Sequence, residues 1–101
     1  MFQGFIRITS RPNGDAPRAI RDKWIGLVLP VSSEVTEPVD ATERAKGKRR
    51  VVGYEVRWDD AMRLLGAKNP EAREWWERKV QRPASLIFEE SCCKVAKDFE
   101  L

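Results

Sequence analysis

Histidine is absent from the 101-residue chain, and this absence excludes more functions than any other feature of the composition. Without histidine there is no Ser-His-Asp or Cys-His catalysis, no histidine-ligated zinc and no imidazole base. An enzyme would have to work through carboxylates, lysine, tyrosine or an unassisted cysteine. Those residues form no recognisable catalytic constellation, so the sequence predicts a protein that is not an enzyme and that carries no cofactor.

Cysteine is scarce as well, and the only two are neighbours, Cys92 and Cys93. Adjacent residues of a strand point to opposite faces, which makes such a pair a poor structural disulfide. There is no Cys-x-x-Cys spacing, and two cysteines without histidine are a weak basis for a metal site. We therefore expect buried free thiols, no metal and a reducing, cytosolic location.

Long apolar runs are also missing, since no stretch reaches the roughly 18 residues that a transmembrane helix needs. The chain does not begin with a basic segment followed by an apolar one, so no secretory signal is expected. Its length suits a single domain over 1–101. The net charge of +3 is small, so the distribution of the charges is more informative than their sum.

The longest uncharged apolar stretch runs from Trp24 to Val31. Both of its alternating faces are apolar, which predicts a central strand, from Ile20 to Val31, covered on both sides. A buried helix is disfavoured because Gly26 and Pro30 would cost it about 1 and about 3 kcal/mol, respectively. Pro30 lacks an amide donor, so it is expected at the exit of the strand or at a sheet edge.

Other stretches have the alternation of a strand with one covered face. Residues 2–10 form one, and residues 51–58 form the clearest strand in the chain. The residues of that second strand predicted to face the core are Val52, Tyr54, Val56 and Trp58. A last strand region at 84–96 is interrupted at 89–91, which is typical of a bulge or bend.

Two helices are expected before that last region. Asp59 or Asp60 is predicted to cap the first helix, and Gly66 to end it in a left-handed conformation. Asn69 and Pro70 have the positions of a cap and a first helical residue for the second helix. The apolar stripe of the second helix is formed by Ala72, Trp75, Trp76, Lys79 and Val80.

The expected element order is therefore β-β-β-α-α-β. It favours a mainly β, α+β domain built as a small, partly open SH3-like barrel. The alternative is a single antiparallel sheet, with the two short helices inserted before the last strand and packed on one face. Residues 32–50 are polar and charged, and we predict a long surface loop there.

Five cations concentrate near the end of that loop, and they are Arg44, Lys46, Lys48, Arg49 and Arg50. Such a cluster attracts phosphate groups, which makes this loop a candidate site for nucleic acid or another acidic partner. The alternative is a solvated loop whose cations are balanced by the four acidic residues just upstream. No apolar anchor accompanies the cluster, so membrane binding is not expected.

Tryptophan is enriched, with four in the chain. Trp75 and Trp76 are adjacent on the expected second helix, where neighbours lie about 100° apart. One of the two rings is therefore expected at the rim, where it would suit a protein interface. The alternative is that all four rings belong to the core or its edge.

These observations favour a small cytosolic, non-enzymatic binding or accessory module. It would act through contact with a partner protein or with its own copy. Nucleic-acid binding through residues 44–50 is the alternative. An enzyme that uses a divalent ion is a third hypothesis, and it needs at least two acids to converge among Asp59, Asp60, Glu89 and Glu90.

Overall fold

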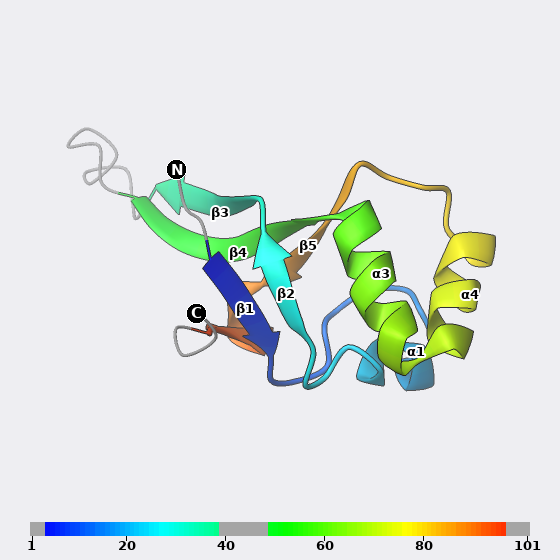
Figure 1. The fold of residues 1–101 in the computed structure, drawn as a ribbon. Coiled ribbons are helices and arrows are strands. Elements are labelled where there is room, and N and C mark those ends of the chain that lie inside the picture. The colour runs from blue at the N-terminus through cyan, green and yellow to red at the C-terminus, as the bar shows by residue number, and fades with distance from the viewer. Residues whose placement is uncertain (1–3, 39–48, 97–101) are drawn as a thin grey trace.

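The computed structural model describes residues 4–38 and 49–96 (Figure 1). The described part is an α+β domain with two three-stranded antiparallel sheets, which confirms the predicted class. The strands are β1 (Gly4–Ile8), β2 (Val28–Val31), β3 (Ser33–Pro38), β4 (Arg49–Arg57), β5 (Ser85–Glu89) and β6 (Cys93–Val95). The helices are α1 (Arg18–Asp22), α3 (Trp58–Lys68), α4 (Pro70–Lys79) and the 3-10 turn η1 (Glu90–Cys92).

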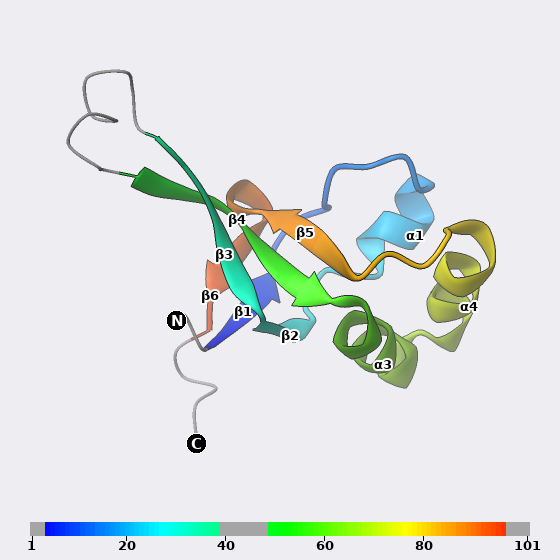
Figure 2. The same ribbon diagram turned by 90° about the horizontal axis from the view of Figure 1, so that it is seen from above.

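The described strands do not close into a barrel, and they form two sheets where the alternative prediction had one. The sheets have the strand orders β2-β1-β6 and β3-β4-β5. The chain passes from the first sheet to the second at Ser32 and returns through η1. The two sheets therefore pack around one core, but their strands form two separate hydrogen-bonded ladders. Helices α1, α3 and α4 gather at one end of the sheets (Figures 1 and 2).

The apolar stretch Trp24–Val31 is not a single strand, and this corrects the prediction. Only its last four residues form β2, and α1 lies where the strand was expected to begin. Gly26 has a φ of +92°, and its N–H donates to the Ile8 carbonyl at 2.7 Å. Gly26 is the last residue of the turn at 23–26 that precedes β2, so Trp24 reaches the core from a turn. Pro30 does lie in an edge strand, as predicted.

Helix α1 is not predicted by the sequence pattern. Pro17 precedes it, and the Pro17 carbonyl accepts hydrogen bonds from the N–H groups of Ile20 and Arg21. The carboxylate of Asp22 binds the guanidinium of Arg11 at 2.6 Å, which ties the helix to the loop before it. These contacts link the helix to the loop next to it. An apolar periodicity, which is the usual sequence signal for a helix, is not part of them, so the sequence pattern did not predict this helix.

Residues 32–50 were predicted as a surface loop, but they contain β3 and the first residues of β4. The two strands form an antiparallel hairpin in which Glu37 lies opposite Arg50, and Pro38 opposite Arg49. Acidic and basic side chains that suggest a solvated loop in the sequence thus face each other across a ladder. The segment that joins the two strands lies outside the described residues.

Strand β4 shows the predicted alternation only in its second half. Tyr54 and Val56 are buried as expected. The ladder with β3 skips Val52, which is a β-bulge. A bulge shifts the alternation by one residue, so Val51 and not Val52 packs against the core.

Helix α3 begins and ends differently from the prediction. Asp59 and Asp60 lie in its first turn instead of capping it, where their charge favours the positive end of the helix dipole. Gly66 lies inside the helix. A Cβ atom there would come within 2.5 Å of the Arg73 Cδ on α4. Gly66 therefore leaves room for the Arg73 side chain of α4 to pack against α3, and it does not terminate that helix.

The start of α4 is where the sequence predicts it. Asn69 is the cap residue, Pro70 is the first helical residue and Glu71 lies in the first turn. The backbone carbonyl of Asn69 accepts the N–H groups of Ala72 and Arg73, while its side chain makes no capping bond.

The predicted interruption of the last strand region is confirmed. It is the η1 turn, and it moves the chain from the sheet of β5 to the sheet of β6. Both cysteines are free and buried, as expected. All the elements except α1 and β3 contribute to a single core whose largest fully buried side chains are Trp24, Ile6, Ile8, Leu29, Met62, Leu65 and Val56.

Candidate protein-binding surface

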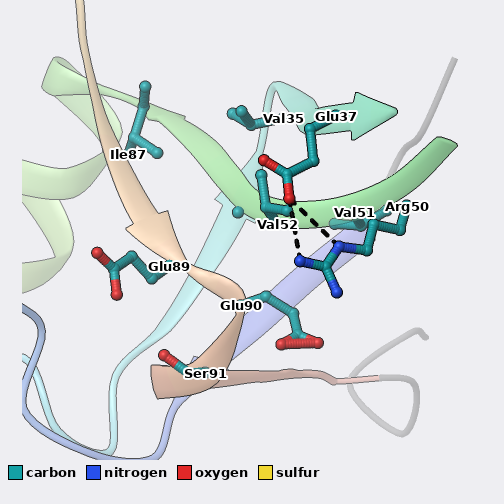
Figure 3. Close-up of a pocket in the computed structure, with 10 residues that line it drawn as sticks. Val35, Glu37, Arg50, Val51, Val52, Ile87, Glu89, Glu90 and Ser91 are labelled. Atoms are coloured by element: carbon teal, nitrogen blue, oxygen red, sulfur yellow. Dashed lines mark hydrogen bonds and ion pairs between the residues drawn. The ribbon is translucent and has the colours of Figure 1, made fainter. Parts of the chain in front are cut away.

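A shallow hollow of about 580 Å³ lies on the outer face of the sheet β3-β4-β5 (Figure 3). The inner face of the same sheet is filled by the buried side chains of Tyr54, Val56 and Phe88. Successive residues of a strand point to opposite faces, so Ile87 belongs to the outer face. All three strands of the sheet, together with η1, contribute residues to the hollow.

All three strands contribute aliphatic residues to the lining of this hollow: Val35 on β3, Val51 and Val52 on β4, and Ile87 on β5. Ile87 is 61% exposed, whereas its neighbour Phe88 is 3% exposed. Covering apolar surface is favourable by roughly 25 cal/mol per Å². The hollow is thus suited to receive an apolar side chain from another molecule. We name it the Ile87 surface.

Charged residues surround this apolar part. Glu37 and Arg50 form an ion pair at 3.0 Å, drawn as the dashed contacts in Figure 3. Glu89 and Glu90 also line the hollow, so its three carboxylates exceed its single guanidinium by two charges. Glu89 accepts a hydrogen bond from the Asn13 side chain at 2.7 Å, and this pairing leaves its negative charge in place. The Ile87 surface therefore has an acidic border in a protein whose net charge is +3.

The predicted basic cluster is only partly described. Arg49 donates hydrogen bonds to the Thr36 hydroxyl at 2.9 Å and to the Thr36 carbonyl at 3.1 Å, while Arg50 pairs with Glu37. These two guanidiniums are held along β3. The other members of the cluster, Arg44, Lys46 and Lys48, lie outside the described residues.

The tryptophans form an aromatic cluster beside α4. Trp24 and Trp58 are buried, and Trp76 packs partly buried against the core. The Trp76 ring lies 5.8 Å from Trp24, 6.4 Å from Trp58 and 5.4 Å from Trp75, always edge to face. The buried indole N–H of Trp76 has no hydrogen-bond partner among the described residues. The neighbouring aromatic rings could accept only a weak hydrogen bond from it. An interface role for Trp75 and Trp76 stays a prediction.

Both thiols are in surroundings that keep them protonated. Burial raises the pKa of Cys92, and burial together with the neighbouring thiol raises the pKa of Cys93 to about 12. Each Sγ lies 3.1 Å from the Glu89 carbonyl and donates to it. Because the thiolate is the nucleophile, these groups are poorly suited to covalent chemistry.

Three of the four acidic residues considered for an enzyme have separate partners, and of the four only Glu89 and Glu90 line the same hollow. Asp59 pairs with Arg82, Asp60 with Arg63 at 3.2 Å, and Glu89 with Asn13. Within residues 4–38 and 49–96, no group of three or more cysteine, aspartate or glutamate side chains could hold a metal ion.

Sequence reasoning missed the Ile87 surface, although a signal for it was present. Leu86, Ile87 and Phe88 are three consecutive apolar residues, and a strand cannot direct all three to one face. One apolar side chain must therefore point away from the core. The contribution of Val35 was hidden because its strand was taken for a loop.

Comparison of the chain with protein-family models, with curated proteins and with solved structures finds no match. In the described parts of the chain, no helix is long and apolar enough to cross a membrane.

Proposed function

We propose that this protein is a non-enzymatic cytosolic binding module that contacts a partner protein through the Ile87 surface. The observation that carries the proposal is the exposed Ile87, which lies with Val35 and Val52 in a hollow on the outer face of the sheet. Isolated apolar side chains are common on protein surfaces, but a concave group of them with a polar border is typical of interaction sites.

The charge of the border specifies the chemistry of the partner. Among the described residues, Glu89 and Glu90 are not balanced by a cation lining the hollow, because Arg50, the one guanidinium there, is paired with Glu37. Complementary charges favour encounter and select against partners of like charge. The expected partner segment therefore combines an apolar side chain, for Ile87, with lysine or arginine for the acidic border.

The test is fluorescence anisotropy with two labelled peptides, one in which leucine alternates with lysine and one in which it alternates with glutamate. The protein should bind the lysine peptide, and Ile87→Asp should weaken that binding by about tenfold, which corresponds to 1.4 kcal/mol. Ile25→Asp is the matched control, since Ile25 is 45% exposed and does not line the hollow. Equal binding of the two peptides, or equal losses in both variants, would refute the proposal.

Self-association is the other form of protein contact that the sequence predicts. Light scattering on the wild type and on Ile87→Asp decides whether a second copy occupies the surface. A dimer that Ile87→Asp dissociates would make the second copy the partner. A dimer that persists in Ile87→Asp and fails in Trp75→Ala would move the interface to the tryptophans and overturn the proposal.

The nucleic-acid alternative makes an opposite prediction about charge. Labelled single-stranded and double-stranded DNA and RNA should not bind the acidic Ile87 surface. Binding that weakens steeply with salt would indicate phosphate contacts. If it is lost when Arg44, Lys46 and Lys48 are changed to glutamine, and unchanged in Ile87→Asp, the basic segment and not the sheet face is the site.

A further inference from the structure

A second, smaller hollow of about 110 Å³ lies on the other side of β5, between that strand and the loop that precedes α1. Its aromatic walls are Trp24, Trp76 and Phe88. The loop contributes Pro12 and Ala16, both of which are buried. Trp24 and Phe88 are in edge-to-face contact at 5.1 Å, so these walls are part of the core and hold their positions. We name this second hollow the aromatic pocket.

Of the described residues, Arg21 is the one charged residue that lines the aromatic pocket. Its Nε donates to the Ala16 carbonyl at 2.7 Å and its Nη1 to the Pro12 carbonyl at 3.1 Å. These bonds hold the guanidinium plane in place without neutralising its charge. The adjacent carboxylate of Asp22 is bound to Arg11, and no carboxylate of the described residues is within ion-pair distance of Arg21.

The arrangement combines an immobilised cation with an apolar interior. A guanidinium recognises a carboxylate by charge-assisted hydrogen bonds, and such bonds are stronger where water is excluded. Within 4–38 and 49–96, no acidic side chain lines the aromatic pocket to compete for Arg21. The Glu89 carboxylate lies outside the lining and is bound to Asn13, which does line it.

We propose that the aromatic pocket binds a small carboxylate with a branched apolar body, the carboxylate at Arg21 and the body against Trp24 and Phe88. An apolar cavity of about 150 Å³ holds benzene. A pocket of about 110 Å³ therefore takes a smaller body, such as the isobutyl group of isovalerate. A valine residue at the C-terminus of a polypeptide has the same chemistry.

This site goes beyond the proposed protein contact and is tested separately from it. Arg21 lines only the aromatic pocket, and Arg50 and Glu37 line only the Ile87 surface. Ile87 lines both, so it is not used in this test.

The experiment is a titration of the unmodified protein with isovalerate and with the neutral amide isovaleramide, at constant ionic strength. It is followed by amide chemical shifts in NMR and by tryptophan fluorescence. Isovalerate should saturate with millimolar affinity and shift the signals of Trp24, Trp76 and the loop at 12–16. Isovaleramide, which has the same shape and no charge, should bind at least tenfold more weakly. Acetyl-valine, with its free carboxylate, distinguishes a polypeptide C-terminus from a free acid.

Arg21→Gln should reduce isovalerate affinity by at least tenfold. The control is Arg18→Gln, because Arg18 is an exposed cation on the same helix that does not line the pocket. Equal binding of acid and amide by the wild type would overturn the proposal even if Arg21→Gln failed to fold. Shifts confined to residues outside the pocket, or equal losses in the two arginine variants, would also overturn it.

Discussion

The two faces of the sheet β3-β4-β5 differ although they are made from alternate residues of the same strands. On β5, Phe88 is 3% exposed in the core and Ile87 is 61% exposed on the outer face. On β4, burial raises the pKa of Tyr54, whereas hydrogen bonds from Ser85 and Ser33 lower the pKa of Glu55 next to it. The inner face contributes stability through packing, and the outer face leaves apolar and charged groups free for contact.

The sharpest test of this difference compares alanine substitutions at two adjacent positions. Phe88→Ala should lower the free energy of unfolding by about 3–5 kcal/mol, because it opens a cavity among packed rings. Ile87→Ala should change it by less than about 1 kcal/mol, because its side chain is mostly in water. Urea denaturation followed by circular dichroism measures both. Similar losses at the two positions would show that the outer face is covered in solution.

Gly53 tests how closely β4 and β5 approach on the outer face. A Cβ atom there would lie 3.0 Å from the Phe88 carbonyl oxygen and 3.3 Å from the Ile87 Cγ2 atom. Gly53→Ala should therefore destabilise the protein by about 1–3 kcal/mol, since a backbone atom must move to make room. Gly53 lines the Ile87 surface, so the same variant should weaken peptide binding. A fully stable variant would contradict the close approach of the two strands.

Alkaline pH should destabilise the protein through the buried thiol of Cys93, which belongs to the shared core and lies on β6 in the other sheet. The folded state holds the pKa of Cys93 at about 12, above its ordinary value of 9.0, so unfolding releases a proton there. Stability from this group is complete below pH 9.0 and is lost as pH rises toward about 12. Each such group gives a slope of at most about 1.4 kcal/mol per pH unit. Urea denaturation from pH 8 to 11 should show this decline in the wild type.

The control for the alkaline effect is Cys93→Ala. The quantity to compare is the slope of the free energy of unfolding against pH, and not the free energy itself. Its decline with pH should be shallower than that of the wild type. Tyr54, whose pKa burial also raises, accounts for part of the remaining slope above its ordinary value of 10.0. Identical slopes in the two proteins would show that the Cys93 thiol titrates normally in the folded state.

The smallest expected effect concerns Glu55 on the outer face. Ser85 Oγ donates to one carboxylate oxygen at 2.5 Å and Ser33 Oγ to the other at 2.7 Å, which joins both neighbouring strands to β4. Ser85→Ala should move the pKa of Glu55 up toward its ordinary value of 4.5, and Ser33→Ala should do so less. The lowered pKa of Glu55 also makes the free energy of unfolding depend on acid pH. Because the pKa is lower in the folded state, the stabilising contribution of Glu55 is present above pH 4.5 and is lost as pH falls through the lowered pKa. Carbon-detected NMR titration of the carboxyl group measures it, and an unshifted Glu55 in both variants would disprove the role of the two hydroxyls.

Local patterns predicted the elements whose boundaries depend on their own residues. The alternation of β4, the Asn69-Pro70 start of α4 and the break after β5 were all legible in the sequence. Several predictions that needed to know what lies next to a residue were wrong, although the edge position of Pro30 was confirmed. Gly66 was taken for a helix terminator because the chain alone does not show that Arg73 packs over it. The candidate sites differ in the same way. The basic cluster can be recognised from the composition of one segment, whereas the Ile87 surface forms only when three strands come together in the fold.

The sequence by itself determined the absence of imidazole chemistry, the α+β class and the apolar residues that form the core. These follow from composition and from the periods of helix and strand, which each segment carries on its own. Only the tertiary structure decided that Trp24 packs from a turn, that Val51 replaces Val52 in the core and that Arg21 faces an aromatic pocket. Each of these depends on a hydrogen-bond partner or a neighbouring wall that is distant in sequence, and the same local pattern allows more than one such neighbour.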